Sequence, residues 1–417
     1  MRKLVAKKRV FIFLSFLIFS MNLIAEDGVK RYESYKGLVM AGYQGWFNTP
    51  DDGADRKWYH LSGKDGFKPG SASVDFWPDV SEYEKVYETA FKFADGKPAY
   101  IFSSHDESTV DTHFRWMKEY GLDGVFMQRF IQEVRNPSGK NHFNKVLTSA
   151  MKAANKYGRA ICVMYDLSGM RSGGEQFLLA DFDEVVETFN IKDRNKNPSY
   201  LYHNGKPLVV IWGVGFNDNR RYDLNDVEII IDHLKSKGFS VMLGVPTYWR
   251  DLTKDTLEDP KLHALIKKSD IIMPWFVGRY GEDSYDPFIR LISEDINWCK
   301  KNNIDYAPLC FPGFSWKNLK GDHTSQITRN KGSFLWKQMS ESIKAGVQSL
   351  YIAMFDEIDE GTAIFKCATE VPVGTPGSTF VPLESGLKSD HYLWLTGEAG
   401  KMLRKEKPLT TVLPQRK

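Results

Sequence analysis

The sequence predicts an α/β fold built as a single (β/α)8 barrel of the TIM type, with an excursion after the first strand. Eight short apolar runs rich in β-forming residues recur along the 417 residues, and most are followed by a longer amphipathic stretch. Each run is apolar at successive rather than alternate positions, which is typical of parallel strands covered on both faces. A doubly wound open sheet is the main alternative, but no glycine-rich nucleotide-binding loop follows the first run.

The predicted strands and helices alternate in chain order. Strands are expected at 38–43, 124–128, 160–165, 208–212, 241–245, 271–276, 306–311 and 350–355. Helices are expected between them, for example at 142–157, 225–237, 285–302 and 333–345, where apolar side chains gather on one side. An additional strand at 99–103 and a helix at 108–120 make up the excursion, and a terminal helix at about 391–405 is expected to dock on the barrel.

The first 25 residues have the pattern of a secretory signal peptide. Residues 1–9 are basic, residues 10–25 are almost wholly apolar, and Ala25 is a small residue at a plausible cleavage point. An uncleaved membrane anchor is the alternative, because the apolar run approaches the length of a short membrane span. We therefore expect residues 26–417 to form one exported domain, periplasmic or extracellular, with no membrane contact after the signal is cleaved.

Composition narrows the class of partner. The 56 Lys and Arg nearly balance the 53 Asp and Glu, and this balance argues against nucleic-acid binding. The 11 Trp and 19 Tyr are more than a core needs, and exposed aromatic rings stack on the apolar faces of sugars. The four cysteines show no CxxC spacing, so no zinc site is expected, and Cys162 and Cys310 lie in apolar runs that favour buried free thiols.

Active sites of such barrels lie at the carboxyl ends of the strands. Aromatic, acidic and basic side chains follow most of the predicted strands, and we expect them to converge on one rim. The candidates for substrate binding are Tyr43, Gln44, Trp46, Arg129, Asp166, Trp249, Trp275, Tyr280 and Trp316. Aromatics and carboxylates on one rim describe a carbohydrate site, although rim aromatics can also simply plug the mouth of a barrel.

The strongest single signal is the run of four carboxylates within residues 356–360, directly after the last predicted strand. So many like charges cannot all ionise cheaply in a partly buried pocket, so at least one pKa should rise, as suits a general acid. Cleavage of a glycosidic bond needs two such groups, and Glu357 and Glu360 are three residues apart in a tight turn. An acidic helix start or a cation site are the alternatives, although the run lacks the regular calcium-loop spacing.

These residues also resemble a known family. The two glutamates three apart before Gly361-Thr362, together with the upstream segment Thr328-Arg329-Asn330, are similar to the catalytic region of the family 99 glycoside hydrolases, the endo-α-mannosidase family. Supporting segments lie in the same order at 41–50, 76–79 and 307–314, so the resemblance covers about 38–405. It adds Arg329, Asn330 and Asp356 to the candidate substrate-binding residues.

The resemblance implies a barrel that cleaves α-linked glycans with retention, with no metal and no cofactor. Glu357 matches the glutamate that takes a proton from the 2-hydroxyl of the sugar, giving a 1,2-anhydro intermediate. Glu360 matches the residue that protonates the leaving group and later activates water. The chain departs from the family at Asp356, where the family has Asn, and at Ile358-Asp359, where it has Trp-His. It also carries Arg129 where the family has Trp, and Met164 and Asp166 where His and Glu are expected.

Three functions remain open from the sequence. The first is a secreted retaining glycoside hydrolase acting on an oligosaccharide or polysaccharide, with mannan-type glycans as the candidate substrate. The second is a catalytically degenerate carbohydrate-binding protein on the same barrel, and the third is a metal-dependent hydrolase. Arg129 and Arg279 either indicate an anionic or substituted sugar or form salt bridges with the acidic run. The oligomeric state is not indicated.

Overall fold

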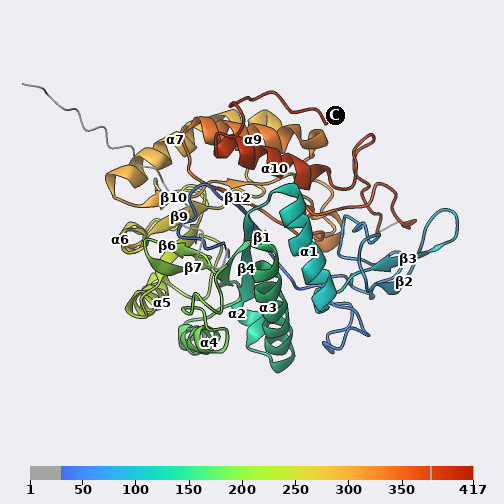
Figure 1. Ribbon diagram of the computed structural model, residues 1–417, viewed down its shortest axis with the longest axis horizontal. Coiled ribbons are helices and arrows are strands. Elements are labelled where there is room, and N and C mark those ends of the chain that lie inside the picture. The colour runs from blue at the N-terminus through green and yellow to red at the C-terminus, as the bar shows by residue number, and fades with distance from the viewer. Residues whose placement is uncertain (1–29, 376–377, 417) are drawn as a thin grey trace, which may run out of the picture.

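The computed structural model describes residues 30–375 and 378–416, and its centre is one parallel sheet that closes into a barrel (Figure 1). The sheet runs through β10, β9, β8, β7, β5, β4, β1, β12 and β11, and all neighbours on this path pair in parallel. The strands are β1 (Val39–Tyr43), β4 (Gly124–Phe130), β5 (Ala160–Asp166), β7 (Lys206–Trp212), β8 (Ser240–Val245), β9 (Ile271–Pro274), β10 (Asp305–Tyr306), β11 (Leu309–Cys310) and β12 (Leu350–Ile352). The predicted (β/α)8 barrel is confirmed.

The barrel closes through a seventh strand that is interrupted at Pro308. Its first half, β10, pairs with β9, and its second half, β11, pairs with β12. Between the halves, Ala307 N donates to Ile272 O at 2.9 Å, and Pro308 O accepts from Tyr351 N at 2.9 Å. Because proline has no N–H to donate, the strand breaks here while its carbonyl still bonds the next strand. The predicted strand 306–311 therefore exists as two short pieces.

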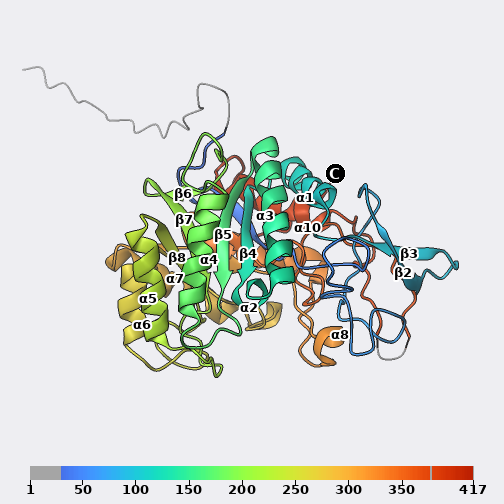
Figure 2. The same cartoon turned by 90° about the horizontal axis from the view of Figure 1, so that it is seen from below.

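Helices surround the barrel on its outer face (Figures 1 and 2). They are α1 (Glu107–Tyr120), α3 (Pro137–Tyr157), α4 (Glu175–Thr188), α5 (Leu224–Ser236), α6 (Lys261–Lys268), α7 (Asp286–Lys301), α9 (Ser333–Lys344) and α10 (His391–Leu403). Short helices α2 (Ile131–Val134) and α8 (Lys317–Lys320) and a two-residue strand, β6 (Tyr202–His203), lie in the connections. The expected helices are confirmed within a few residues, except that 142–157 begins five residues earlier, at Pro137, because proline suits a helical first position.

The excursion after β1 forms a small subdomain beside the barrel (Figure 2). It holds an antiparallel pair, β2 (Tyr87–Lys92) and β3 (Pro98–Ile101), joined by a hairpin. β2 alternates buried and exposed side chains, as expected for a strand with one face in solvent. Barrel strands such as β1 and β8 are instead buried at every position. The predicted strand at 99–103 is thus part of a hairpin outside the barrel.

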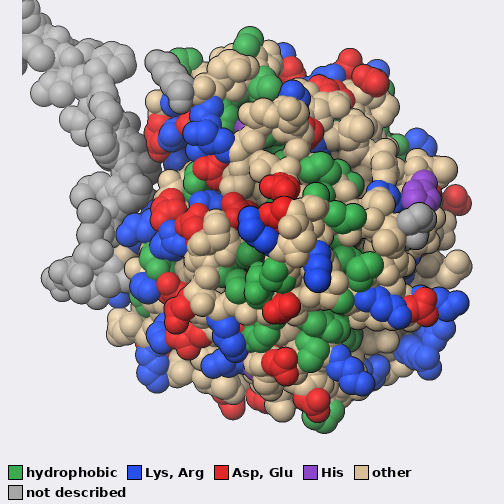
Figure 3. Space-filling model, turned by 90° about the vertical axis from the view of Figure 1, so that its right-hand side faces the viewer, with side chains coloured by type: hydrophobic (Ala, Val, Ile, Leu, Met, Phe, Trp, Pro, Cys, Tyr) green, Lys and Arg blue, Asp and Glu red, His purple; other side chains and the backbone are tan. Residues whose placement is uncertain are grey.

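The barrel interior is packed so closely that small residues are needed. A Cβ atom on Gly42 of β1 would lie 2.1 Å from Met354 Cε and 2.3 Å from Tyr351 Oη. The four cysteines are buried free thiols, as expected for Cys162 and Cys310. On the surface, acidic and basic side chains are interspersed over the face shown in Figure 3.

The apolar segment predicted as a signal peptide, residues 1–25, lies outside the described residues. Among the residues that are described, no helix combines the length and the apolar character needed to cross a bilayer. The signal peptide and the domain boundary at residue 26 stay predictions.

Close strand packing gives a first test. A Cβ on Gly124, where β4 meets both β1 and β5, would lie 2.0 Å from the backbone oxygen of Ala160. We expect Gly124→Ala to lower the free energy of unfolding by about 1–3 kcal/mol, because neither backbone can move without breaking ladder hydrogen bonds. Gly281→Ala is the matched control, since its Cβ would meet only Ile327 Cγ2, at 3.8 Å. Equal urea midpoints for the two variants would contradict this packing.

Candidate active site

A cleft of about 840 Å³ lies at the carboxyl ends of the barrel strands. Its volume suits a ligand of several hundred Å³, such as an oligosaccharide. The side chains around it come from the ends of β1, β4, β5, β7 and β9 and from the loops after β9, β11 and β12. They include Gln44, Trp46, His60, Gln128, Phe130, Asp166, Trp212, Trp275, Arg279, Tyr280, Phe314, Trp316, Glu357 and Glu360.

The turn after β12 brings Glu357 and Glu360 to the same cleft. Thr362 N donates to Glu357 O at 3.1 Å, so the turn closes on itself, and Ser315 N donates to Glu360 O at 2.8 Å from the neighbouring loop. Gly361 has φ +66°, and a Cβ there would lie 3.2 Å from Ser315. The turn therefore depends on glycine at this position.

Glu357 is held by two side chains. Gln44 Nε2 donates to its Oε1, and Thr362 Oγ1 donates to its Oε2 at 2.5 Å. Only 4% of Glu357 is exposed, so the carboxyl group has little freedom to rotate. Both oxygens accept hydrogen bonds, which favours the ionised form and fixes the direction in which the remaining lone pairs point.

Burial and the repulsion of neighbouring carboxylates raise the pKa of both glutamates. Burial is the largest cause of the raised pKa of Glu357, followed by the nearby charges of Glu360 and Asp359. Burial and then Asp359 raise the pKa of Glu360 to about 7, while the indole of Trp316 opposes the shift. Because the charge of Glu360 raises the pKa of Glu357, the two groups titrate as a pair, and the pair retains a proton near neutral pH. Such a pair can supply one acid and one base to the same bond.

Asp356 connects the acidic turn to the first strand. Its two carboxylate oxygens accept from Gln44 N at 2.8 Å and Gly45 N at 2.9 Å. Burial raises the pKa of Asp356 to about 7, and the two backbone donors counteract part of that shift. Gly45 has φ +62°, which glycine adopts without strain. The carboxylate is therefore occupied in shaping the loop that presents Gln44.

Asp359 lies behind an aromatic platform. Its Oδ2 is 3.1 Å from His60 Nδ1, and the His60 ring stacks on Trp46 at 3.7 Å between centroids and 5° between planes. Trp46 also stacks on Phe130 at 4.8 Å. This stack lines one part of the cleft and offers ring faces of the kind that sugars pack against.

Several residues around the cleft carry unsatisfied polar atoms. Within the described residues, Gln44 Oε1, Gln128 Oε1, Trp46 Nε1 and Trp212 Nε1 are buried and have no hydrogen-bond partner. Unpaired buried polar groups are uncommon in proteins and tend to mark functional sites. The four atoms around this cleft are free to hydrogen-bond the hydroxyl groups of a bound sugar.

The structure separates the fourteen predicted site residues, twelve for substrate binding and two for catalysis, into two groups. Eight of the fourteen candidates line the cleft: Gln44, Trp46, Asp166, Trp275, Tyr280, Trp316, Glu357 and Glu360. The other six do not line it: Tyr43, Arg129, Trp249, Arg329, Asn330 and Asp356. Burial raises the pKa of Asp166, which contributes a third carboxyl group to the cleft.

The six corrections have physical causes. Tyr43 faces outward to α1, where its Oη lies 2.8 Å from His113 Nδ1. Arg129 also faces outward and forms a buried double hydrogen bond with Asp181 of α4. Trp249 is fully buried, with its indole N–H donating to Asp295 Oδ2 at 3.3 Å.

Of the other three residues, Arg329 and Asp356 hydrogen-bond the backbone of loops next to the cleft, and Asn330 lies away from it. Arg329 Nη2 donates to Gly361 O and Ala363 O, both at 2.8 Å, so Arg329 braces the chain just after Glu360. Asn330 donates to Glu282 Oε2 at 2.5 Å outside the cleft, and Asp356 binds the backbone as described above.

Arg129 and Arg279 both form salt bridges, but not with the acidic run at 356–360. Arg129 pairs with Asp181 and Arg279 with Asp255, so neither arginine pairs with the acidic run. Arg279 nevertheless lines the cleft.

Some lining residues were missed by the sequence analysis. Gln128 and Trp212 stand at the ends of predicted strands, so the strand-end rule could have found both. His60 comes from the excursion and Thr324–Ile327 from the loop before α9, and nothing in their local pattern distinguishes them.

The chain has distant relatives among known proteins. It is 22% identical to the glycoprotein endo-alpha-1,2-mannosidase of Mus musculus over 336 residues, which are 75% of this chain and 64% of that protein. The match thus spans slightly less than two thirds of the relative. The family 99 endo-alpha-mannosidase of Bacteroides thetaiotaomicron superposes with a TM-score of 0.64 at 15% identity, over 89% of this chain and 99% of the other. The expected resemblance to the family 99 glycoside hydrolases is confirmed.

Two further comparisons agree on the fold. The Bacteroides thetaiotaomicron enzyme in complex with Bis-Tris-propane superposes with a TM-score of 0.63 at 17% identity, over 89% of this chain and 99% of that one. A glycoside hydrolase-like protein superposes with a TM-score of 0.52 at 12% identity, over 78% of this chain and 94% of the other. No family model matches the chain.

The raised pKa of Glu360 predicts a pH-dependent cost to stability. Between the unfolded pKa near 4.5 and the folded pKa of about 7, the folded state holds a proton that the unfolded state has lost, so stability falls as pH rises through this window. Glu360→Gln removes this cost. We expect the variant to be more stable than the unmodified chain by about 1–3 kcal/mol at pH 8, and nearly equal to it at pH 4.5.

Thermal unfolding at the two pH values measures this difference. The exposed Glu258→Gln is the control and should behave like the unmodified chain at both. A Glu360→Gln effect of the same size at both pH values would contradict the assignment.

Proposed function

We propose that the chain is a glycoside hydrolase that cleaves α-linked, mannosyl-containing glycans through the pair Glu357 and Glu360. The observation that carries the proposal is this pair of buried carboxyl groups with raised pKa values, in one turn at the carboxyl end of a barrel that resembles the family 99 mannosidases. Both named relatives in that family are endo-mannosidases, which supports an α-mannosyl substrate.

The two glutamates would divide the work of a retaining cleavage. Glu357, held by Gln44 and Thr362, would take the proton from the 2-hydroxyl of the bound sugar as that oxygen attacks the anomeric carbon. Glu360 would protonate the departing oxygen, and the 1,2-anhydro sugar would then be opened by a water that Glu360 deprotonates. In the second step Glu360 recovers a proton from that water, and Glu357 returns its proton to the 2-oxygen as the C1–O2 bond breaks, so the pair returns to its starting state.

The changed residues at 356, 358 and 359 leave Glu357 and Glu360 in place, and Asp359 contributes to their raised pKa values. Ile358 is fully buried, and its carbonyl accepts from Asp75 N at 3.0 Å. Asp356 shapes the loop that carries Gln44, and Asp359 lies behind the His60 platform. The three changed residues therefore support the turn, which favours the hydrolase over a degenerate binding protein.

The setting of the reaction is also a proposal. Residues 1–25 support export to the periplasm or the cell exterior, and the cleft would take an oligosaccharide or polysaccharide. The chemistry described above uses only side chains of this chain, and no metal ion or cofactor enters it.

Glycosyl fluorides can distinguish the roles of the two glutamates. Fluoride leaves without a proton from an acid, so Glu360→Gln should release fluoride from an α-mannooligosaccharyl fluoride far faster than it cleaves the matching glycan. Glu357→Gln should be slow on both substrates, by about 10²-fold or more, because the attacking hydroxyl loses its base. Initial rates of fluoride release and of glycan cleavage, read by mass spectrometry, measure these effects.

Glu258→Gln serves as the control and should match the unmodified chain on both substrates. If both Glu357→Gln and Glu360→Gln cleave the glycan as fast as the unmodified chain, the two glutamates do not have the catalytic roles assigned to them. Glycan binding with no new reducing end from any α-mannan or α-glucan would favour the carbohydrate-binding protein instead.

The pair should also give a bell-shaped pH profile for kcat/KM. Activity requires one proton on the pair, so it should fall at high pH as that proton is lost, with an alkaline limb near 7, and fall at low pH as the base becomes protonated. Glu360→Gln, assayed on the fluoride, should lose the alkaline limb and keep the acidic one. Persistence of the alkaline limb in that variant would assign it to another group.

A further inference from the structure

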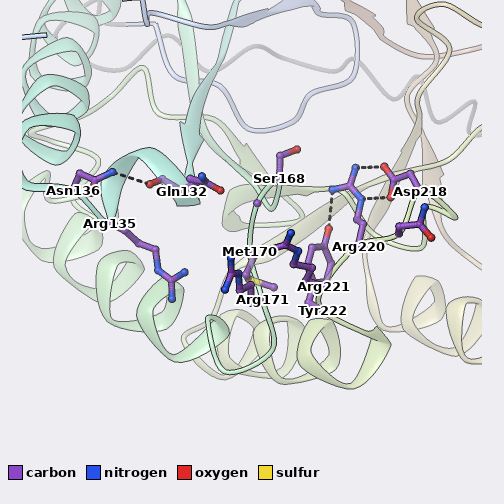
Figure 4. A pocket seen from close by; sticks show the side chains of 12 residues that line it. Gln132, Arg135, Asn136, Ser168, Met170, Arg171, Asp218, Arg220, Arg221 and Tyr222 are labelled. Atoms are coloured by element: carbon purple, nitrogen blue, oxygen red, sulfur yellow. Dashed lines mark hydrogen bonds and ion pairs between the residues drawn. The ribbon is translucent and has the colours of Figure 1, made fainter.

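A second cavity adjoins the cleft and is lined by arginines (Figure 4). Its volume is about 640 Å³, and Gln132, Ser168, Gly169, Asp218 and Arg220 line both spaces. We call the part lined by Arg135, Arg171, Arg220 and Arg221 the arginine annexe. The cleft and the annexe therefore adjoin along the five residues that line both spaces.

The annexe carries an unbalanced positive charge. Arg220 is neutralised by Asp218, with its Nε and Nη2 donating at 2.9 and 3.0 Å, and Asp218 is the one carboxylate among the lining residues. Among the described residues, no ion pair joins Arg135, Arg171 or Arg221 to a carboxylate. Three guanidinium groups are thus left to face the cavity or solvent.

The backbone holds two of these charges together. Arg171 and Arg221 are paired in a parallel bridge, and Ser172 N donates to Arg221 O at 2.8 Å, so the loops after β5 and β7 are fixed side by side. Arg135 joins them from the end of α2, after β4. Like charges held next to each other are unfavourable unless an anion lies between them. Guanidinium forks match the oxygens of carboxylate, phosphate and sulfate.

The acidic side chains of the cleft make the position of the reacting bond unfavourable for an anionic group. Glu357 and Glu360 line the cleft and share one proton near neutral pH, and the negative charge that the pair keeps would repel an anionic group placed beside it. A charged substituent on the glycan is therefore directed away from the acid pair and toward the annexe.

We propose, on the basis of the function proposed above, that the arginine annexe binds an anionic substituent of the glycan that occupies the cleft. The shared chemistry is a negatively charged oxygen group carried by a sugar: a sulfate ester, a phosphate ester or a uronic acid. Arg135, Arg171 and Arg221 bind this group, and the neutral sugars beside it pack against the aromatic platform.

The test compares neutral and charged forms of one α-linked mannooligosaccharide, with sulfated, phosphorylated and uronate-bearing versions as separate arms. Affinity is measured by calorimetry on Glu360→Gln, which avoids turnover, with and without Arg135→Gln, Arg171→Gln and Arg221→Gln together. We expect Glu360→Gln to bind at least one charged version about tenfold or more tightly than the neutral one, and the arginine substitutions to remove this preference while leaving neutral binding unchanged. The charged glycan that loses the most affinity on the arginine substitutions identifies which anionic group the annexe binds.

Arg290→Gln on the outer helix α7 is the matched control and should keep the preference, because its side chain is 86% exposed and lies outside both cavities. If the combined variant folds poorly, the single substitutions replace it, and each should lose part of the preference for the charged glycan. Arg171→Lys, which keeps the charge but loses the planar guanidinium group, should also lose part of it. Equal affinity for neutral and charged glycans, or an equal loss on both, would overturn the annexe proposal. If the unmodified chain cleaves none of these glycans but Glu360→Gln still prefers a charged one, the annexe proposal stands and the proposed hydrolase function is wrong.

Discussion

The active turn depends on a carboxylate that does not itself line the cleft. Asp356 accepts two backbone N–H groups from the loop after β1, and this contact joins the last barrel strand to the first on the side where the cleft opens. The same loop carries Gln44, whose side chain donates to Glu357. A glutamate from one end of the chain is therefore oriented by a residue from the other end, and the barrel must close before the site exists. The long sequence separation explains why no local pattern reveals this support.

Strand geometry explains which site residues the sequence could and could not identify. Side chains alternate across a strand, so consecutive residues at a strand end point in opposite directions. Gln44 and Gln128 face the cleft, whereas their neighbours Tyr43 and Arg129 face the helices outside. The strand-end rule finds the right place in the chain but not the direction, because a strand apolar at every position gives no sign of which face is inside. Applying the alternation from one known inward residue would have corrected both.

The parts that lie in loops were harder to foresee. Trp249 follows a strand but folds back onto α7, where Asp295 takes its N–H. His60 reaches the cleft from an excursion whose own fold is set by contacts far along the chain, including Asp359. Loop positions of this kind depend on tertiary partners rather than on local propensity, so the sequence predicted the barrel and singled out Trp46 of the platform but not His60, which stacks on it.

The charges of the site are arranged in order across the two cavities. Carboxyl groups whose ionisation is suppressed by burial line the cleft, and the Asp218–Arg220 pair lies at the shared border. The annexe holds guanidinium groups that form no ion pair within the described part of the chain. A neutral glycan has no reason to prefer one direction in such a field, because it carries no charge for the gradient to act on. A glycan with one negative group has a single favourable orientation, with that group in the annexe and the chain held across the acid pair. The field would then select the substrate and also the bond that lies between Glu357 and Glu360, because the bridge between Arg171 and Arg221 fixes where the charged group binds.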